Sequence, residues 1–418
     1  MLFAILISDP ERRNVIMRIK LASDSETVPK SVILKQVLPR PEDSDNREAI
    51  ARFARDWAGL AFASQVQERE EVHATPVFYG SDSELLFILI EDLGDPHVSL
   101  VDSLLVADRE RATEALERYM HALAEFHTTG YGQNARFTSI LAGIHPGART
   151  VEQDLAETTD YLLPQMATSI QLLELGQSEA FLDDVRHVLD AMFEPGPFTV
   201  LTHGDIAPDN VFDGDKGLQL IDFEVCALRN ALLDATYLRM CIPTGWCAKA
   251  VPEDLLEHLE TLYRTDLAQV IPEASDDLAY STSYVHACAY HVLYQMAHLH
   301  GCLEQDQLWG GPMPQYPLWE QMPNSSRARF LSRLEAFIEV ADKHSAAFPD
   351  EPPILPSLKA MAENMLAAVK ARWGDEAKPL DVYPAFLTSP SEAYKGRMQD
   401  MTGSGEDEET PSVDNLNL

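Results

Sequence analysis

The sequence predicts an α+β fold in which a small, strand-rich N-terminal part precedes a larger, mainly helical part. Short runs of Val, Ile and Leu recur before residue 93, with the length and composition typical of strands. Beyond them, apolar residues recur at helical spacing over long stretches of the chain. A single later block, residues 198–224, again contains short apolar runs separated by turn residues.

The N-terminal elements are predicted from this pattern. One helix is expected over Glu48–Gln65, because its apolar residues form a stripe at helical spacing. The strand pattern breaks at Glu91–Gly94, so residues 1–93 are expected to form one domain. Strands are expected over Leu2–Ile7, Val15–Leu21, Ser31–Val37, Val77–Gly80 and Leu85–Ile90.

Residues 94–388 are expected to form a helical domain. After about Ser389 the periodicity ends, and the run Gly403–Glu409 consists of Gly, Ser and acidic residues. Such a composition cannot bury enough apolar surface to fold, so residues 389–418 are expected to be a disordered acidic tail. The helices are expected over Ala107–Thr128, Gln153–Met192 with an interruption near Gly176, Glu253–Ile271, Asp276–Cys302, Ser325–Ser345 and Leu355–Arg372.

Charge limits the possible partners of the chain. Its 418 residues include 67 acidic and 32 basic side chains, for a formal net charge of −35. A chain this acidic repels nucleic acids and anionic membrane surfaces, so neither is expected as a partner. Solubility is the simpler explanation of the charge, and a cationic small-molecule partner is the alternative.

A cytoplasmic location is expected. Met1–Ser8 is apolar but lacks the basic residues and the cleavage site of a signal peptide. No run of about 18 apolar residues is present, as a membrane span would require. The five cysteines are odd in number and irregularly spaced, which suits a reducing compartment.

The block Val200–Glu224 carries the strongest functional signal. Asp205 is followed five positions later by Asn210, and Asp222 comes after a predicted hairpin. Kinase-like phosphotransferases build a metal–phosphate site with this spacing. Asp205 would then accept the proton of an attacking hydroxyl, and Asn210 and Asp222 offer the oxygen ligands that Mg²⁺ prefers. The alternative is that these are ordinary turn residues, a role common for Asp and Asn.

The motif His203-Gly204-Asp205-x-x-x-x-Asn210, followed by Ile221-Asp222-Phe223-Glu224, resembles the aminoglycoside phosphotransferase-like family, which also includes choline and small-metabolite kinases. The resemblance covers roughly residues 10–300. It implies a two-lobed protein-kinase-like fold, ATP and Mg²⁺ as cofactors, and a small molecule bearing a hydroxyl group as acceptor. Because the glycine of the kinase D-F-G motif is replaced by Glu224, no activation-loop switch is expected.

The resemblance also implies a nucleotide clamp in the N-terminal domain. Lys35, on an otherwise apolar predicted strand, corresponds to the lysine that contacts the α- and β-phosphates. Its acidic partner on the following helix is expected to be Asp56, with Glu48 as the second candidate. Glu91 opens the segment that resembles the hinge between the lobes, and we expect it to help bind the nucleotide. A surface lysine is the alternative for Lys35.

Four further residues receive supporting or substrate roles from the resemblance. His203 is expected to hold the catalytic loop without transferring a proton. Asp234 resembles the aspartate that braces this loop by accepting its backbone N–H groups, although a helix N-terminal acid is the alternative. Asp209 and Glu224 are expected to face the substrate.

The sequence departs from the family pattern at the loop between the first two predicted strands. Kinase-like folds often cover the phosphates with glycines there, but Asp9–Asn14 contains none. Either Arg12 and Arg13 contact phosphate through their side chains, or the loop is degenerate.

The sequence therefore predicts an ATP- and Mg²⁺-dependent phosphotransferase acting on a small-molecule hydroxyl. The acceptor could be an aminoglycoside or a housekeeping metabolite such as an amino alcohol or sugar. A catalytically degenerate nucleotide-binding or interaction module is the alternative from another class. A metal site formed by His298 and Cys302 is disfavoured, since aromatic and apolar neighbours indicate a packed core helix.

Overall fold

A computed structural model describes residues 3–7, 14–22, 28–38, 47–66, 74–94, 98–214, 217–307, 324–374 and 377–387. The glycine-free loop, apart from Asn14, and the predicted acidic tail lie outside these residues. Within the described residues, no helix is both long enough and apolar enough to cross a membrane.

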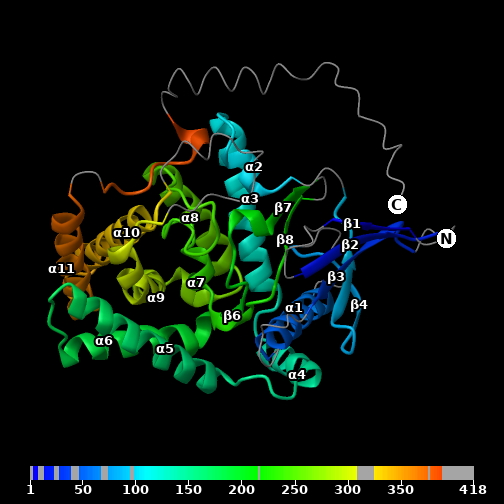
Figure 1. The fold of residues 1–418 in the computed structure, drawn as a ribbon, viewed down its shortest axis with the longest axis horizontal. Helices are drawn as coiled ribbons and strands as arrows, with labels where there is room; N and C mark the ends of the chain where they lie inside the picture. The colour runs from blue at the N-terminus through cyan, green and yellow to red at the C-terminus, as the bar shows by residue number, and fades with distance from the viewer. Residues whose placement is uncertain are drawn as a thin grey trace.

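A five-stranded antiparallel sheet occupies one end of the molecule (Figure 1). Its spatial order is β1-β2-β3-β5-β4, so β3 lies at the centre. Lys35 pairs with Ile16 on one side and with Ile88 on the other. The strands are β1 (Phe3–Leu6), β2 (Asn14–Lys20), β3 (Ser31–Val37), β4 (Phe78–Asp82) and β5 (Phe87–Glu91).

One helix, α1 (Arg47–Val66), connects the sheet to the helical part of the molecule. Most of its apolar side chains are buried, including Phe53, Leu60 and Phe62. It contacts β4 as well as helices α3 and α4 of the larger part. Side chains of α1 therefore lie between the sheet and the helical part of the molecule.

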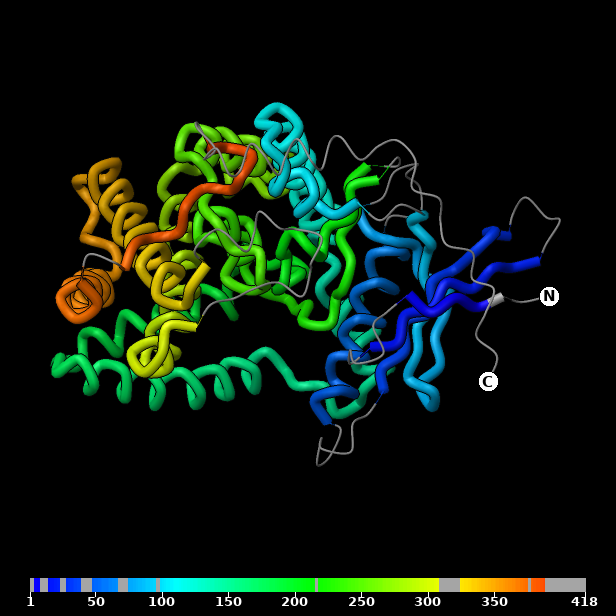
Figure 2. Tube along the Cα trace, turned by 45° about the horizontal axis from the view of Figure 1, so that its top comes forward, coloured from blue at the N-terminus to red at the C-terminus, as the bar shows by residue number. Residues whose placement is uncertain are grey.

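The larger part is a helical assembly in which α9 is central. This helix packs against α5, α6 and α10, and α3 packs against α8. Figure 2 shows the N-terminal strands and the last helices at opposite ends of the molecule. The helices are α2 (Leu100–Leu104), α3 (Arg109–Thr129), α4 (Asn134–Ile144), α5 (Val151–Leu172), α6 (Glu179–Phe193), α7 (Leu232–Ala235), α8 (Glu253–Ala268), α9 (Asp277–Glu304), α10 (Ser326–Ala347) and α11 (Pro356–Trp373).

Two short strand pairs carry the motif block. Strand β6 (Thr199–Thr202) pairs with β9 (Ala227–Asn230), and β7 (Val211–Gly214) pairs with β8 (Gly217–Leu220). Together they hold both ends of the segment that contains Asp205, Asn210 and Asp222.

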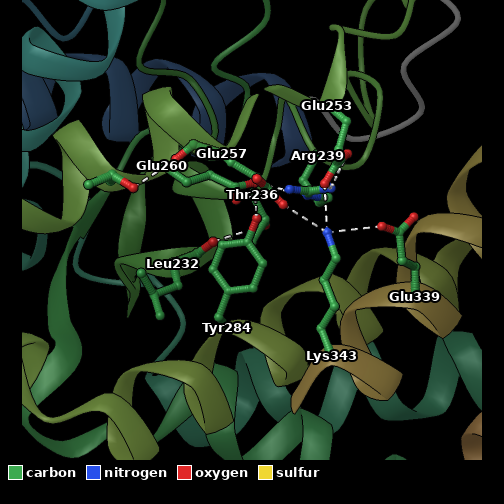
Figure 3. A network of polar contacts seen from close by, with 10 residues as sticks. Leu232, Thr236, Arg239, Glu253, Glu257, Glu260, Tyr284, Glu339 and Lys343 are labelled. Atoms are coloured by element: carbon green, nitrogen blue, oxygen red, sulfur yellow. Dashed lines mark hydrogen bonds and ion pairs between the residues drawn. The ribbon is translucent and has the colours of Figure 1, made fainter. Parts of the chain in front are cut away.

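A buried arginine links the helices of the larger part (Figure 3). Arg239 is 6% exposed, and its guanidinium forms paired contacts with Glu260 at 2.9 Å and with Glu253 at 2.8 and 2.9 Å. Glu260 also accepts a hydrogen bond from Tyr284 on α9. Lys343 on α10 contacts Glu253 at 2.7 Å, so the network joins α8, α9 and α10.

The predicted α+β, two-lobed architecture is confirmed. The predicted strands and long helices are present with ends shifted by a few residues, and the break near Gly176 separates α5 from α6. Helices α2, α4 and α7 were not predicted. Helix α4 does carry apolar residues at helical spacing, with Phe137 buried and Ile140, Leu141 and Ile144 partly buried against the core, so its pattern was present in the sequence.

Candidate active site

The β7–β8 hairpin brings together two candidate ligands that lie far apart in the chain. Val211 pairs with Leu220, so the residues just outside the hairpin, Asn210 and Ile221, also lie opposite each other. The Ile221 N–H donates to the Asn210 carbonyl at 2.9 Å. Asp222 follows Ile221 directly, so the pairing of Ile221 with Asn210 places Asp222 next to Asn210.

Asp205 is oriented from both sides of its carboxylate. The Asn210 amide donates to the Asp205 carbonyl at 2.9 Å and to Oδ2 at 3.2 Å. The Thr244 hydroxyl donates to Oδ1. An alcohol group thus already occupies one position from which a substrate hydroxyl could reach this carboxylate.

The turn before Asp205 requires a glycine. Gly204 has a φ of +79°, and a Cβ there would lie 2.8 Å from the Val225 carbonyl oxygen. The Tyr237 hydroxyl donates to the Gly204 carbonyl at 2.6 Å. The backbone at Gly204 is therefore held on both sides, which fixes the direction in which Asp205 leaves the turn.

A buried carboxylate braces the same turn. Asp234 is fully buried and accepts hydrogen bonds from the backbone N–H groups of His203 at 2.6 Å and Gly204 at 3.0 Å. His127 Nε2 lies 3.2 Å from the Asp234 carboxylate, and its Nδ1 lies 2.8 Å from the Tyr263 hydroxyl. Burial alone would raise the pKa of Asp234, but the hydrogen bond and charge of His127 hold it below its usual value.

Both ring nitrogens of His203 are used inside the loop. Nε2 contacts the Ile221 carbonyl at 2.9 Å, and the Asp205 N–H donates to Nδ1 at 3.3 Å. The ring also packs on Phe223, with centroids 4.7 Å apart. His203 therefore ties the Asp205 turn to the Asp222 segment and leaves neither nitrogen for a substrate.

Lys35 meets two carboxylates at the junction of the sheet and the helical part. Its Nζ lies 2.6 Å from Asp56 Oδ2 and 2.5 Å from Asp222 Oδ1. Burial alone would lower the pKa of Lys35, but the charges of Asp222 and Asp56 outweigh it and raise the pKa. The direct contact identifies Asp56, and not Glu48, as the helix partner; Glu48 instead pairs with Arg52 at 2.9 Å.

Asp222 combines an unusual backbone with an accessible side chain. Its φ is +72°, a left-handed conformation that costs about 1–2 kcal/mol outside glycine but that Asp tolerates better than most residues. Burial would raise the pKa of Asp222, and the Lys35 ammonium holds it below its usual value. The side chain remains 35% exposed, so a ligand can reach it.

The two candidate substrate residues face different neighbours. Asp209 lies beside Cys247, whose Sγ is 3.8 Å from Asp209 Oδ1, and burial followed by the charge of Asp205 raises its pKa. Glu224 lies 3.8 Å from Arg52, and burial followed by the charge of Asp222 raises its pKa.

Glu91, the expected hinge residue, is the last residue of β5. Its carboxylate accepts a hydrogen bond from the Val77 N–H at 3.2 Å, and its own N–H donates to the Val77 carbonyl at 2.8 Å. The next residue, Asp92, pairs with Arg18 of β2 at 2.7 Å. Glu91 and Asp92 therefore tie the end of β5 to the segment before β4 and to β2.

Asn210 and Asp222 are compatible with a magnesium ion. Among the described residues, Lys35 is the group that contacts the Asp222 carboxylate, so its second oxygen remains available. Within the same residues, no cluster of three or more His, Cys, Asp or Glu side chains could hold a metal by itself. This arrangement suits Mg²⁺, which is commonly bound through one or two protein groups together with waters and phosphates.

Several contacts in the site were not predicted from the sequence. Thr244, Tyr237 and His127 all hold the Asp205 turn, as does Tyr119, whose hydroxyl donates to the Ile206 carbonyl at 3.0 Å. Thr244 lies in the stretch between Cys241 and Cys247, whose unusual composition is a local sequence signal. The other three residues have no such signal in the sequence around them.

The sequence matches the model of a phosphotransferase enzyme family over residues 16–270, which is more than half of the chain. The chain belongs to this family. The match spans β2 to the end of α8 and so includes Lys35, Asp56 and the whole motif block. No curated protein matches the sequence.

Among solved structures, a choline kinase from Cryptosporidium parvum is similar, with 11% identity over 82% of this chain and 90% of its own, and a TM-score of 0.44. A Plasmodium vivax ethanolamine kinase shares 12% identity over 85% of this chain and 83% of its own, with a TM-score of 0.41. An aminoglycoside phosphotransferase in complex with AMP-PNP and hygromycin B shares 11% identity over 88% of this chain and 94% of its own, with a TM-score of 0.36. Likeness at this level does not identify the substrate of this chain.

Proposed function

We propose that this phosphotransferase moves the γ-phosphate of ATP to a hydroxyl group of a small molecule, with Mg²⁺ as cofactor. The observation that carries the proposal is the convergence of Asp205, Asn210 and Asp222 with the Lys35–Asp56 pair in a chain of this family. These groups come from the sheet, from α1 and from the motif block, so the fold alone brings them together.

Asp205 acts as the acceptor of the substrate proton. Its carboxylate is oriented by Asn210 and already accepts a hydrogen bond from the Thr244 hydroxyl. A substrate hydroxyl that replaces or joins Thr244 would be aligned for attack, and alignment together with electrostatic stabilisation accounts for nearly all catalysis of this reaction. His203 and Asp234 act only by holding the turn.

Lys35 binds nucleotide phosphate, and Asp56 keeps its ammonium extended toward the site. Asn210 and Asp222 would hold Mg²⁺, which when bound offsets the negative charge of the transferring phosphoryl group. Asp222 contacts Lys35 directly at 2.5 Å, so the phosphate clamp and the metal ligand are adjacent.

An amino alcohol or another cationic acceptor is favoured over a neutral sugar. Asp209 follows Asp205 by four residues. Burial, and then the negative charge of Asp205, raise the pKa of Asp209. A positively charged group beside Asp209 would relieve this unfavourable burial of negative charge. An assay in which neutral sugars are phosphorylated as well as amino alcohols would contradict this preference.

The function is tested by ATP turnover with a panel of amino alcohols, aminoglycosides and sugars. With the best acceptor, Asp205→Asn should lower kcat by about 10²–10⁴-fold, the usual contribution of general-base assistance. Nucleotide affinity should stay near normal, because Asp205 contacts the acceptor and not the nucleotide.

Two controls complete this test. Asp222→Ala should abolish the Mg²⁺-dependent thermal stabilisation by ATP while leaving the folded structure intact by circular dichroism. If no acceptor is phosphorylated and calorimetry finds no binding of Mg²⁺ and ATP to the wild type, the chain is a degenerate binding module and the proposal fails.

A further inference from the structure

A cavity of about 750 Å³ lies beside α1, apart from the candidate active site. Its walls come from the N-terminal half of α1, from α4, from residues 145–150, from the start of α5 and from β9. Figure 1 shows α4 next to α1, and the two helices pack against each other. None of Lys35, Asp56, Asp205, Asn210 or Asp222 lines this cavity.

Arginine is the dominant charged residue of its lining. Arg47, Arg55, Arg149 and Arg229 all contribute to the wall. Arg149 is neutralised by Asp154 at 2.7 Å. In the described part of the chain, the guanidinium groups of Arg55 and Arg229 form no ion pair with any carboxylate.

Arg229 has the least satisfied side chain of the four. Its Nε is buried and has no hydrogen-bond partner among the described residues. Its guanidinium carbon lies 4.9 Å from the centre of the Phe193 ring, a cation–π contact that leaves the N–H donors of the group unused. Burying a charged donor without an acceptor is costly, so an acceptor supplied by a ligand would stabilise this arrangement.

Arg55 and Arg229 line the same cavity, and so does Cys226. The Cys226 Sγ–H donates to the Arg55 carbonyl at 3.3 Å, and Arg229 follows Cys226 by three residues, in β9. An anion inside this cavity can therefore approach either guanidinium group.

The carboxylates of the lining do not cancel this charge. Glu48, Glu152 and Asp154 also reach the cavity, but Asp154 is paired with Arg149, and Glu48 is bound at 2.9 Å by Arg52, which is not part of the lining. Arg55 and Arg229 therefore keep positive charge that no ion pair within the described residues neutralises. The remaining wall is largely apolar, with Phe137, Leu141, Val151, Phe193 and Leu228.

We propose that this cavity binds a small organic anion, whose phosphate or carboxylate group is held by Arg55 and Arg229 and whose apolar body packs against the aromatic and aliphatic wall. Guanidinium groups match the planar, bidentate geometry of both anions. The volume of about 750 Å³ lies within the range of cavities that enclose whole small molecules. This site is separate from the site of phosphoryl transfer and does not depend on the proposed reaction.

The probe for the site is phenylphosphonate, which pairs an anionic head with an apolar ring and carries no hydroxyl acceptor on carbon. Isothermal titration calorimetry on the full chain should show binding of phenylphosphonate and much weaker binding of the neutral analogue benzamide. Arg229→Gln and Arg55→Gln should each weaken phenylphosphonate binding by about tenfold or more, the scale of a lost charge-assisted hydrogen bond.

Matched variants separate this site from other cationic positions. Arg186→Gln changes an exposed arginine of α6 outside the cavity and should leave the affinity unchanged. Lys35→Met should also leave it unchanged, and loss of binding in that variant would place the probe at the nucleotide clamp and overturn the proposal. Absence of binding to the wild type, or unchanged binding in Arg55→Gln, would also overturn it. Arg55→Gln settles the question even if Arg229→Gln fails to fold.

Discussion

At the scale of single residues, the two carboxylates around Lys35 have different consequences. Asp222 is partly exposed and lies where a ligand can compete for it, whereas Asp56 is 4% exposed and also accepts the Phe223 N–H at 3.0 Å. Asp56 thus fixes both the lysine and the backbone next to Asp222. Without its charge, the Lys35 ammonium would be drawn entirely to Asp222.

Asp56→Asn should therefore lower kcat/KM for ATP by about tenfold, because Asn can still accept the Phe223 N–H but cannot balance the ammonium. Steady-state kinetics at varied ATP measure this change. Glu48→Gln is the matched control, since Glu48 lies on the same helix but pairs with Arg52, and its kinetics should equal the wild type. Equal losses in both variants would mean that the general charge of α1, and not the Asp56 contact, supports nucleotide binding.

His291 should make the fold sensitive to acid. Burial lowers its pKa from 6.5 to about 4, helped by the charge of Arg333 and opposed by Asp234 and by the hydrogen bond to the Leu233 carbonyl. The unfolded chain therefore binds a proton on this residue at a higher pH than the folded chain does. The contribution of neutral His291 to the free energy of unfolding is fully present above about pH 6.5. It is lost as the pH falls toward 4, and the loss reaches up to about 3 kcal/mol.

Urea unfolding at pH 7 and pH 4.5 tests this pH dependence. The loss of unfolding free energy between these values should be smaller in His291→Gln than in the wild type by about 2 kcal/mol. An unchanged pH dependence in His291→Gln would show that this histidine is not the sensitive group.

The sequence predicted the residues of the motif and two residues that hold its turn, His203 and Asp234, but not the other residues that hold it. Asn210 and Asp222 are brought together by a local hairpin, whose turn and apolar runs are visible in the sequence. Thr244 and His127 reach the Asp205 turn from segments far along the chain, and their positions depend on how helices pack. No local sequence pattern encodes such packing, so these contacts are visible only in the three-dimensional structure.

At the scale of elements, the polar network around Arg239 links α8, α9 and α10. Two carboxylates on α8, Glu253 and Glu260, bind one buried guanidinium, and Tyr284 of α9 donates to Glu260 (Figure 3). Breaking a buried ion pair by removing one partner leaves the other charge without compensation.

Arg239→Met should accordingly lower the free energy of unfolding by about 3–5 kcal/mol in a urea titration. The control is Lys343→Met, because Lys343 binds the same Glu253 but is 48% exposed. An exposed pair contributes about 0–1 kcal/mol, so this control should stay within that range. A loss in Lys343→Met as large as in Arg239→Met would mean that the network acts through its surface and not through the buried arginine.

The elements were predicted according to their length. Long, apolar helices such as α9 and α10 were found within a few residues of their ends. In contrast, the shorter α4 was not predicted, although Phe137, Ile140, Leu141 and Ile144 stand at helical spacing in it. Helices α2 and α7 are only about one turn long, and such short helices are formed by their tertiary surroundings, so sequence periodicity gives little warning of them.

At the scale of the whole molecule, the net charge of −35 opposes the compact state through self-repulsion. Salt screens this repulsion, since the Debye length falls from about 10 Å at 0.1 M to about 3 Å at 1 M. The same screening weakens exposed ion pairs such as Arg186–Glu179 and Lys370–Glu335, but each of these contributes at most about 1 kcal/mol. The imbalance of 67 acidic over 32 basic residues should therefore dominate.

The melting temperature should rise by a few degrees when NaCl is increased from about 0.02 to 0.5 M. Differential scanning calorimetry measures the shift. Screening saturates as the Debye length becomes shorter than the spacing of surface charges, whereas stabilisation by excluded solutes such as sucrose continues to increase with concentration. A rise that levels off in NaCl but not in sucrose identifies charge repulsion as the cause. A fall in melting temperature with NaCl would instead show that surface ion pairs, and not the net charge, control the stability of this acidic phosphotransferase.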